Sequence, residues 1–180
     1  MERKEMDNVI KQLKQFKTDA IYEKKKHYNA ADRKRRSYKW ISITQIVLNA
    51  ITSTALFAVV FGNNSKVAQI IALIITIVAT ILAGVQKISD FENQAQGNTK
   101  AADMYLRICK KINLTINLIK DGAVPNEEIV KKADEICIEI SQANEIGSQF
   151  STSSKDYIKA KESIKNGEED YTDEELNLWE

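Results

Sequence analysis

Residues 41–61, ISITQIVLNAITSTALFAVVF, and residues 67–85, VAQIIALIITIVATILAGV, indicate the fold class of this chain. No charge interrupts the 26 residues between Lys39 and Lys66 or the 20 residues between Lys66 and Lys87. A hydrocarbon core about 30 Å thick needs about 20 helical residues to cross it, so both segments have membrane-spanning length. Residues 62–66 between them are rich in turn formers. The sequence predicts an all-α membrane protein built on a two-transmembrane-helix hairpin.

Two other interpretations fit these segments less well. A soluble bundle with two buried helices would keep a charged outer face, and residues 67–85 have none. A pair of strands is suggested by the β-branched residues, but each run is far longer than the usual 5–6 residues. We therefore keep the hairpin as the prediction.

The charges around the hairpin predict its orientation. The whole chain has 180 residues and a net charge of +1, but residues 1–40 carry 13 basic and 6 acidic side chains, whereas residues 87–180 carry 12 and 19. The positive-inside rule places the N-terminus in the cytoplasm, and two spans return the C-terminus there. The basic residues before the first span either only determine topology or also bind anionic lipid head groups; they are Lys24, Lys25, Lys26, Arg33, Lys34, Arg35, Arg36 and Lys39.

Polar residues form a stripe along each predicted span. In the first span the stripe falls within about 100° of the helix surface; its members are Ser42, Gln45, Asn49, Thr52 and Ser53. The second stripe repeats at 4-3-4-3-4 spacing, as in a heptad seam, through Gln69, Leu73, Thr76, Thr80, Ala83 and Lys87. Amides are expensive in lipid, so these stripes either pack helices together or line an aqueous pore. As pore-lining or gate residues we predict Ser42, Gln45, Asn49, Thr52, Ser53, Gln69, Thr76 and Thr80.

Long amphipathic helices are predicted on both sides of the hairpin. Residues 1–40 have apolar positions at helical spacing, at Met6, Val9, Ile10, Leu13, Phe16, Ala20, Ile21, Tyr28 and Ala31. Residues 87–121 continue the second span as one helix, with Gly97 as its weakest point. Its apolar face begins at Ile88 and resembles a coiled-coil seam, which predicts an oligomer interface at Phe91, Ala95, Ala102, Tyr105, Ile112, Ile116 and Ile119.

The C-terminal part is predicted to be a helical extension. Asp121-Gly122 ends the preceding helix and Pro125 starts the next, which runs to about Ile146. Its inward positions are predicted as Val130, Ala133, Cys137, Ile140 and either Ala143 or Asn144. A shorter helix covers residues 154–165, and Thr172 to Glu175 form a capping box for a last short helix. We accordingly divide the chain into residues 1–121, with spans at 41–61 and 67–86, and an extension at 122–180.

No pattern in the sequence predicts catalysis. The chain has one histidine and two cysteines, without zinc spacing. It contains no nucleotide-binding or hydrolase motif. Cys109 and Cys137 are expected to pack in helix faces, and His27 either packs between helices, lies at the lipid surface or senses pH. We predict no enzyme activity, no catalytic residue, no metal, no cofactor and no direct binding of nucleic acid.

Three stretches of the chain resemble a known family. The first is Tyr22 followed by residues 27–31, HYNAA, before the basic run 33–36. The second is the hairpin itself. The third is residues 91–95, FENQA, followed by residues 100–107, KAADMYLR. Together, residues 22–119 resemble SLATT domains, which are bacterial two-transmembrane effectors associated with nucleotide second messengers and SLOG sensors. The family often has a histidine after the second span, where this chain has Gln94 or Gln96, so no imidazole role carries over.

The resemblance implies a function in the bacterial inner membrane. Such effectors are expected to form pores or disrupt the membrane in anti-phage and conflict systems, and to kill or arrest the cell when an upstream sensor or nucleotide-signalling partner acts. A pore requires a homo-oligomer of about four or more subunits, because two spans cannot enclose one. The alternative is a membrane-anchored helical scaffold without a pore, which docks a cytosolic partner.

Overall fold

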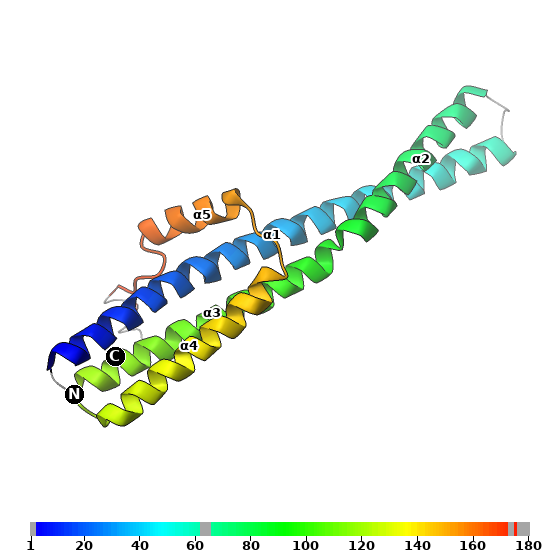
Figure 1. The fold of residues 1–180 in the computed structure, drawn as a ribbon. Helices are drawn as coiled ribbons and strands as arrows, with labels where there is room; N and C mark the ends of the chain where they lie inside the picture. Colours follow the sequence, from blue (N-terminus) through cyan, green and yellow to red (C-terminus); the bar gives the residue numbers. More distant parts are fainter. Residues whose placement is uncertain (1–2, 62–65, 173–174, 176–180) are drawn as a thin grey trace. The chain divides into compact units, whose positions relative to one another are not determined.

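The computed structural model describes residues 3–61, 66–172 and 175. Over these residues it is all-helical. Five helices follow one another (Figure 1): α1 (Arg3–Phe61), α2 (Lys66–Ser89), α3 (Phe91–Lys120), α4 (Asn126–Ser148) and α5 (Ser154–Lys165). The chain divides into two compact units, residues 1–31 with 96–180 and residues 32–95, and α1 and α3 contribute to both. The predicted all-α class is confirmed.

The first unit has a hydrophobic core between α1, α3 and α4. The predicted apolar positions of α1 contribute to it, with Leu13 and Ala20 buried and Met6, Val9, Ile10, Phe16 and Ile21 packed around them. The predicted face of α3 also lies inside. On this face, Ala95 at the end of the second unit is buried. The buried positions of the same face in the first unit are Asn98, Ala102, Tyr105, Cys109, Ile112, Ile116 and Ile119. The sequence spacing of 3 and 4 therefore located this helix face correctly.

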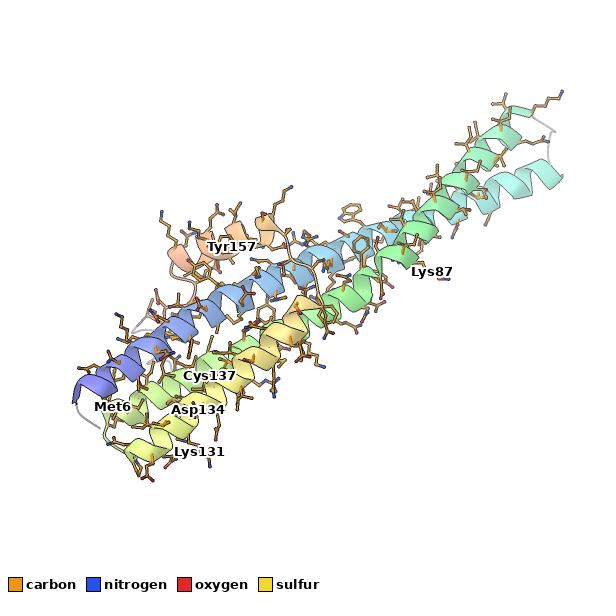
Figure 2. The ribbon with its side chains drawn as sticks, viewed as in Figure 1. Met6, Lys87, Lys131, Asp134, Cys137 and Tyr157 are labelled. Carbon is orange, nitrogen blue, oxygen red and sulfur yellow. The ribbon has the colours of Figure 1, made fainter. Side chains whose placement is uncertain are left out.

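Helix α4 enters the core one position away from the prediction. Ile129 and Ile136 are buried, whereas Val130 is 47% exposed. Cys137, which is labelled on α4 in Figure 2, is half-buried. Ile129 and Val130 are adjacent and equally apolar, so hydrophobicity could not distinguish them, and the residue that packs against α1 and α3 is the earlier one. Ile140 and Ala143 do join the core as expected.

Two glycines end helices in left-handed backbone conformations. Gly122 has φ +63 after α3, and Gly167 has φ +80 after α5. At each end the next amide bonds back to the carbonyl five residues earlier, as from Ala123 N to Leu118 O at 3.1 Å and from Glu168 N to Ser163 O at 3.2 Å. This is the Schellman arrangement, which glycine adopts without steric penalty. Both predicted helix ends are confirmed.

The second unit is a helical hairpin of α1 residues 32–61 and α2. The expected uninterrupted helix from the second span into residues 87–121 is wrong in one detail, because Asp90, at φ 43, separates α2 from α3. Hydrogen bonds continue across it, from Asp90 N to Gln86 O at 3.1 Å and from Gln94 N to Asp90 O at 3.0 Å. The break changes the helix phase, which leaves Ile88 87% exposed, against prediction.

Gly97 is not a weak point of α3. It is buried, and an added Cβ would lie 2.1 Å from Cε1 of Phe150, in the connection between α4 and α5. The missing side chain lets the phenyl ring pack on the helix backbone. The predicted turn at 62–66 lies outside the described residues except for Lys66, which begins α2. Most of the last predicted helix also lies outside them. The predicted capping box is present, since Glu175 N donates to Thr172 Oγ1 at 3.2 Å and Thr172 N donates to Glu175 Oε2 at 2.8 Å.

Candidate functional site

The hairpin has an inner seam in which the two helices face each other. On α2 the seven positions that are not exposed repeat every three or four residues: Ala68, Ala72, Ile75, Ala79, Leu82, Gln86 and Ser89. On α1 the corresponding positions are Tyr38, Ile41, Gln45, Leu48 and Thr52, with Ser42 beside them. Three alanines on α2 allow close approach of the helices, as in many membrane helix pairs. We call these residues the inner seam.

The outer surface of the hairpin is largely apolar. The exposed large side chains of α2 recur on every side of the helix outside the inner seam: Val67, Ile70, Ile71, Leu73, Ile74, Ile77, Val78, Ile81 and Val85. On α1 Trp40 is 70% exposed and Ile46 is 68% exposed. Such a contiguous apolar surface indicates contact with lipid or with another protein. Among the described residues, the stretch Lys66–Lys120 is long and apolar enough to cross a membrane.

Polar groups in the inner seam are only partly satisfied. Gln86 Nε2 donates to Ser42 Oγ at 2.9 Å, a contact between the two helices. Gln45 Nε2 and Thr52 Oγ1 are buried, and within the described residues neither has a hydrogen-bond partner. An unpaired buried polar group destabilises a structure by about 1–3 kcal/mol. These two groups therefore favour any rearrangement that gives them water or another polar partner.

The remaining predicted pore-lining residues lie outside the inner seam. Asn49 and Ser53 are exposed on α1, and Gln69, Thr76 and Thr80 are exposed on α2. The three hydroxyl groups among them form hydrogen bonds within their own helices. Ser53 Oγ donates to Asn49 O, Thr76 Oγ1 to Ala72 O and Thr80 Oγ1 to Thr76 O, each at 2.8 Å. A hydroxyl paired in this way can face lipid without an unmet donor.

The structure thus divides the predicted polar stripes. Ser42, Gln45 and Thr52 face the other helix, and the rest face outward. The seam on α2 runs one position before the stripe predicted through Gln69, Thr76 and Thr80. Gln86 was not predicted. The sequence signal for this face was the alanine spacing at residues 68, 72 and 79 rather than the polar residues.

At the cytoplasm-facing end predicted for the hairpin, a buried lysine pairs with a glutamine. Lys34 is 4% exposed, and its Nζ donates to Gln94 Oε1 at 2.6 Å. Gln94 is one of the two positions where the resembling family often has histidine. Lys34 is therefore a packing residue of the second unit. Arg33, Arg35, Arg36 and Lys39 remain exposed, with Arg35 Nη1 3.2 Å from Asp32 Oδ1.

The other three predicted head-group lysines are held by carboxylates of the first unit. Lys24 Nζ lies 2.6 Å from Glu169 Oε2, Lys25 Nζ lies 2.9 Å from Glu168 Oε2, and Lys26 Nζ lies 2.6 Å from Glu23 Oε2. In this conformation these ammonium groups are engaged within the chain. Binding of lipid head groups is consequently a prediction for the exposed residues Arg33, Arg35, Arg36 and Lys39.

The predicted oligomer interface lies largely inside one chain. Ala95, Ala102, Tyr105, Ile112, Ile116 and Ile119 are between 0% and 8% exposed, and Phe91 is half-buried. Helices of the same chain cover this face of α3 because α4 returns along it. These residues are therefore not available for contacts between subunits in this conformation. Assembly through other surfaces stays a prediction.

A buried polar cluster surrounds His27 in the first unit. His27 is 3% exposed, its Nδ1 lies 2.8 Å from Asn98 Oδ1, and its ring stacks on Tyr105 at 5.9 Å. Tyr105 Oη donates to Asn144 Oδ1 at 2.7 Å. Burial, and secondly the charge of Glu23, raise the pKa of Tyr105 to about 12. The cluster joins α1, α3 and α4, so the predicted packing of His27 between helices is confirmed.

Space around this cluster depends on a second glycine. An added Cβ at Gly147 would lie 2.9 Å from His27 Nε2 and 3.4 Å from Tyr105 Oη. A cavity of about 320 Å³ adjoins the cluster and includes Glu23, Lys26 and Phe150 in its lining. In the described residues no group of three or more His, Cys, Asp or Glu side chains could hold a metal ion.

The sequence of the chain matches a family of effector domains. The model for SMODS and SLOG-associating 2TM effector domain family 4 matches residues 9–175. The chain belongs to this family, as its resemblance to SLATT domains predicted. The family description names two transmembrane segments, and with the apolar helix α2 it indicates a membrane protein. No curated protein and no solved structure gives a match.

The match extends beyond residue 121, which we expected to end the family domain. Helix α4 supplies Ile129, Ile136 and Ala143 to the same core as α1 and α3. The division at residue 121 stays a prediction, but the helices on either side of it share one hydrophobic core.

Proposed function

We propose that this chain is a pore-forming effector of a bacterial conflict system, and that the inner seam of its hairpin becomes the wall of the pore. The observation that carries the proposal is the distribution of polarity in the second unit. The outer surface is largely apolar, although Asn49 and Gln69 are exposed on it, whereas Gln45 Nε2 and Thr52 Oγ1 are buried without partners in the described structure. Two unpaired polar groups at the centre of the helix pair favour an arrangement in which they contact water, which packing of the two helices alone does not provide.

In the resting arrangement the two helices shield this seam from lipid. When several copies assemble, each hairpin opens, and Ser42, Gln45, Thr52 and Gln86 turn toward a shared aqueous path. Water then satisfies the two unpaired groups, which lowers the free energy of the open state relative to the closed one. A monomer cannot form such a path, so the activity requires a homo-oligomer, with about four or more copies.

The proposed site of action is the bacterial inner membrane, with both termini in the cytoplasm. The exposed basic residues Arg33, Arg35, Arg36 and Lys39 precede the first span, and the positive-inside rule keeps such residues on the cytoplasmic side. An upstream sensor or a nucleotide-signalling partner, as the family's associations suggest, would supply the opening signal. The expected outcome is death or arrest of the cell.

The proposal is tested by membrane potential in bacteria that express the chain. A voltage-sensitive dye compares wild type with Gln45→Leu/Thr52→Val and with the control Asn49→Leu/Ser53→Ala, at equal membrane levels. We expect wild type and the control to depolarise the cells and the seam variant to lose this activity. Equal depolarisation by all three chains would contradict a role for the inner seam.

Replacement of both spans distinguishes the scaffold alternative. A chain with plain Leu/Ala helices at 41–61 and 67–85 keeps its activity if the spans only anchor the protein. It loses its activity if they form the pore.

A further inference from the structure

Helix α5 is attached to the first unit mainly through polar contacts. Among the described residues, the hydrophobic core is formed by α1, α3 and α4, and α5 contributes no member. Its buried residues are Asp156 and Ala160. Asn29 Nδ2 donates to the carbonyl of Asp156 at 3.1 Å, and Tyr157 stacks on Tyr22 at 5.9 Å (Figure 2). A helix held in this way can be released without exposing a large apolar surface.

Two glutamates after α5 close the attachment. We call Glu168 and Glu169 the acidic clasp. Lys24 Nζ lies 2.6 Å from Glu169 Oε2, and Lys25 Nζ lies 2.9 Å from Glu168 Oε2 and 3.2 Å from Glu169 Oε1. Lys25 Nζ also donates to Ser163 Oγ at 2.6 Å. Hydrogen bonds from Ser163 and Lys25 lower the pKa of Glu168.

The backbone conformation after α5 places the two glutamates beside these lysines. Gly167 adopts φ +80, and the two hydrogen bonds of the Schellman arrangement reverse the chain at this point. Lys24 is only 8% exposed, so little water reaches its side chain. Removal of one partner of a buried ion pair leaves an uncompensated charge, which is strongly unfavourable.

The clasp also covers a groove between α1 and α3. Basic and apolar side chains of α1 and α3 line the groove together with residues 168–171 and Glu175. Its lining residues from α1 and α3 are Lys17, Ile21, Lys24, Leu106, Cys109, Lys110 and Asn113. Cys109 is 6% exposed, and its burial raises the pKa of its thiol. The thiol is therefore a natural reporter of whether the groove is covered.

We propose that this groove is a docking surface for acidic peptide segments, and that the chain's own residues 168–172 occupy it as a releasable latch. Charge complementarity carries the proposal: Glu168 and Glu169 pair with Lys24 and Lys25, and the acidic residues 168–170 line the groove together with Lys17 and Lys110. Salt weakens partly exposed ion pairs. Higher salt should therefore open the latch. Its opening frees Lys24 and Lys25, and it removes the ion pairs that help to hold α5 against α1.

The test measures the rate at which Cys109 reacts with a maleimide in the detergent-solubilised full chain. Cys137→Ser leaves Cys109 as the only thiol, because the chain has two cysteines. In this background we expect Glu168→Gln/Glu169→Gln to raise the rate at least tenfold. The matched control is Glu135→Gln/Glu139→Gln, which removes the two carboxylates paired with Lys111 at 3.0 and 2.8 Å. The control should leave the rate unchanged.

Salt and a free peptide complete the test. Raising the salt from about 0.05 to about 0.5 M should accelerate the reaction of the Cys137→Ser chain, and should have little effect on the clasp variant. A peptide with the sequence of residues 166–175, NGEEDYTDEE, should protect Cys109 in the clasp variant. The same peptide with glutamine in place of each glutamate and asparagine in place of each aspartate should not.

Two results would overturn the proposal. One is an equal reaction rate in the clasp variant and in its control, which would mean that the glutamates do not keep the groove covered. The other is protection by both peptides alike, which would mean that the groove does not select acidic segments. Neither readout depends on pore activity.

Discussion

Replacement of Gly97 by alanine should destabilise the first unit, and only because Phe150 packs on it. The added Cβ would lie 2.1–2.3 Å from three atoms of the phenyl ring. Carbon atoms in contact are normally about 3.5–4.0 Å apart, so the ring must move by more than about 1 Å. Overpacking of this kind destabilises proteins by about 1–3 kcal/mol. Alanine in a helix interior is more stabilising than glycine by about 0.5–1 kcal/mol, which offsets part of this loss. The expected net loss is about 1–2 kcal/mol.

A double-mutant cycle separates the two terms. In a Phe150→Ala chain the ring is absent, so Gly97→Ala should stabilise the unit by about 0.5–1 kcal/mol through helix propensity alone. The coupling energy between the two positions is then about 2 kcal/mol, well above the scatter expected for independent sites. Urea unfolding followed by the circular dichroism of the helices reports the stability of this unit. Additive effects of the two changes would refute the packing argument.

Two further predictions concern the cluster around His27 and its neighbours. Gly147→Ala should lower the free energy of unfolding of the first unit by about 1 kcal/mol, because its Cβ would lie 2.9 Å from His27 Nε2; a stabilised chain in the same urea assay would contradict this. Tyr105 and Tyr28, which donates to Asp103 Oδ1 at 2.5 Å, have pKa values raised from 10.0 to about 12, in both cases chiefly by burial. Their folded-state pKa values lie above the unfolded value, so their contribution to stability is complete below pH 10 and is lost as pH rises toward 12. Alkaline absorbance titration should show two tyrosines that ionise near pH 12, and Tyr28→Phe should remove one of them; an unchanged titration would count against the assignment.

The helices of the first unit could be predicted closely from the sequence. The 3-4 spacing from Ala95 to Ile119 gave the buried face of α3, because that helix has polar residues on its other sides. The limits of α5 were correct because Ser153 and Gly167 are strong capping residues. In α4 adjacent apolar residues allowed two registers, and the prediction took the wrong one.

The hairpin was harder to predict in detail for a physical reason. In a span that faces lipid, hydrophobicity no longer distinguishes the inside from the outside. The polar residues Thr76 and Thr80 therefore suggested a seam, whereas the small residues Ala72 and Ala79 form it. The sequence also contained no local signal for a break at Asp90, and glycine at position 97 suggested the weak point instead.

Contacts between distant parts of the chain could not be predicted at all. Lys24 and Glu169 are separated by 145 residues, and each belongs to a charged segment that seemed independent of the other. The lysines were interpreted by their distance in sequence from the span, which left topology determination and lipid binding as the alternatives. In the fold they lie beside α5 and the acidic segment that follows it.

The central claim is that the inner seam contacts water in the open pore. The most direct test places a single cysteine at Gln45 or at Thr52 in a chain with Cys109→Ser and Cys137→Ser, and applies a charged, membrane-impermeant thiol reagent to conducting bilayers. We predict that the current falls when either seam cysteine is modified, and that a cysteine at Ile46, which is 68% exposed on the outer face, does not respond. The account would be contradicted if modification of a cysteine at Ile46 reduced the current while modification at either seam position had no effect.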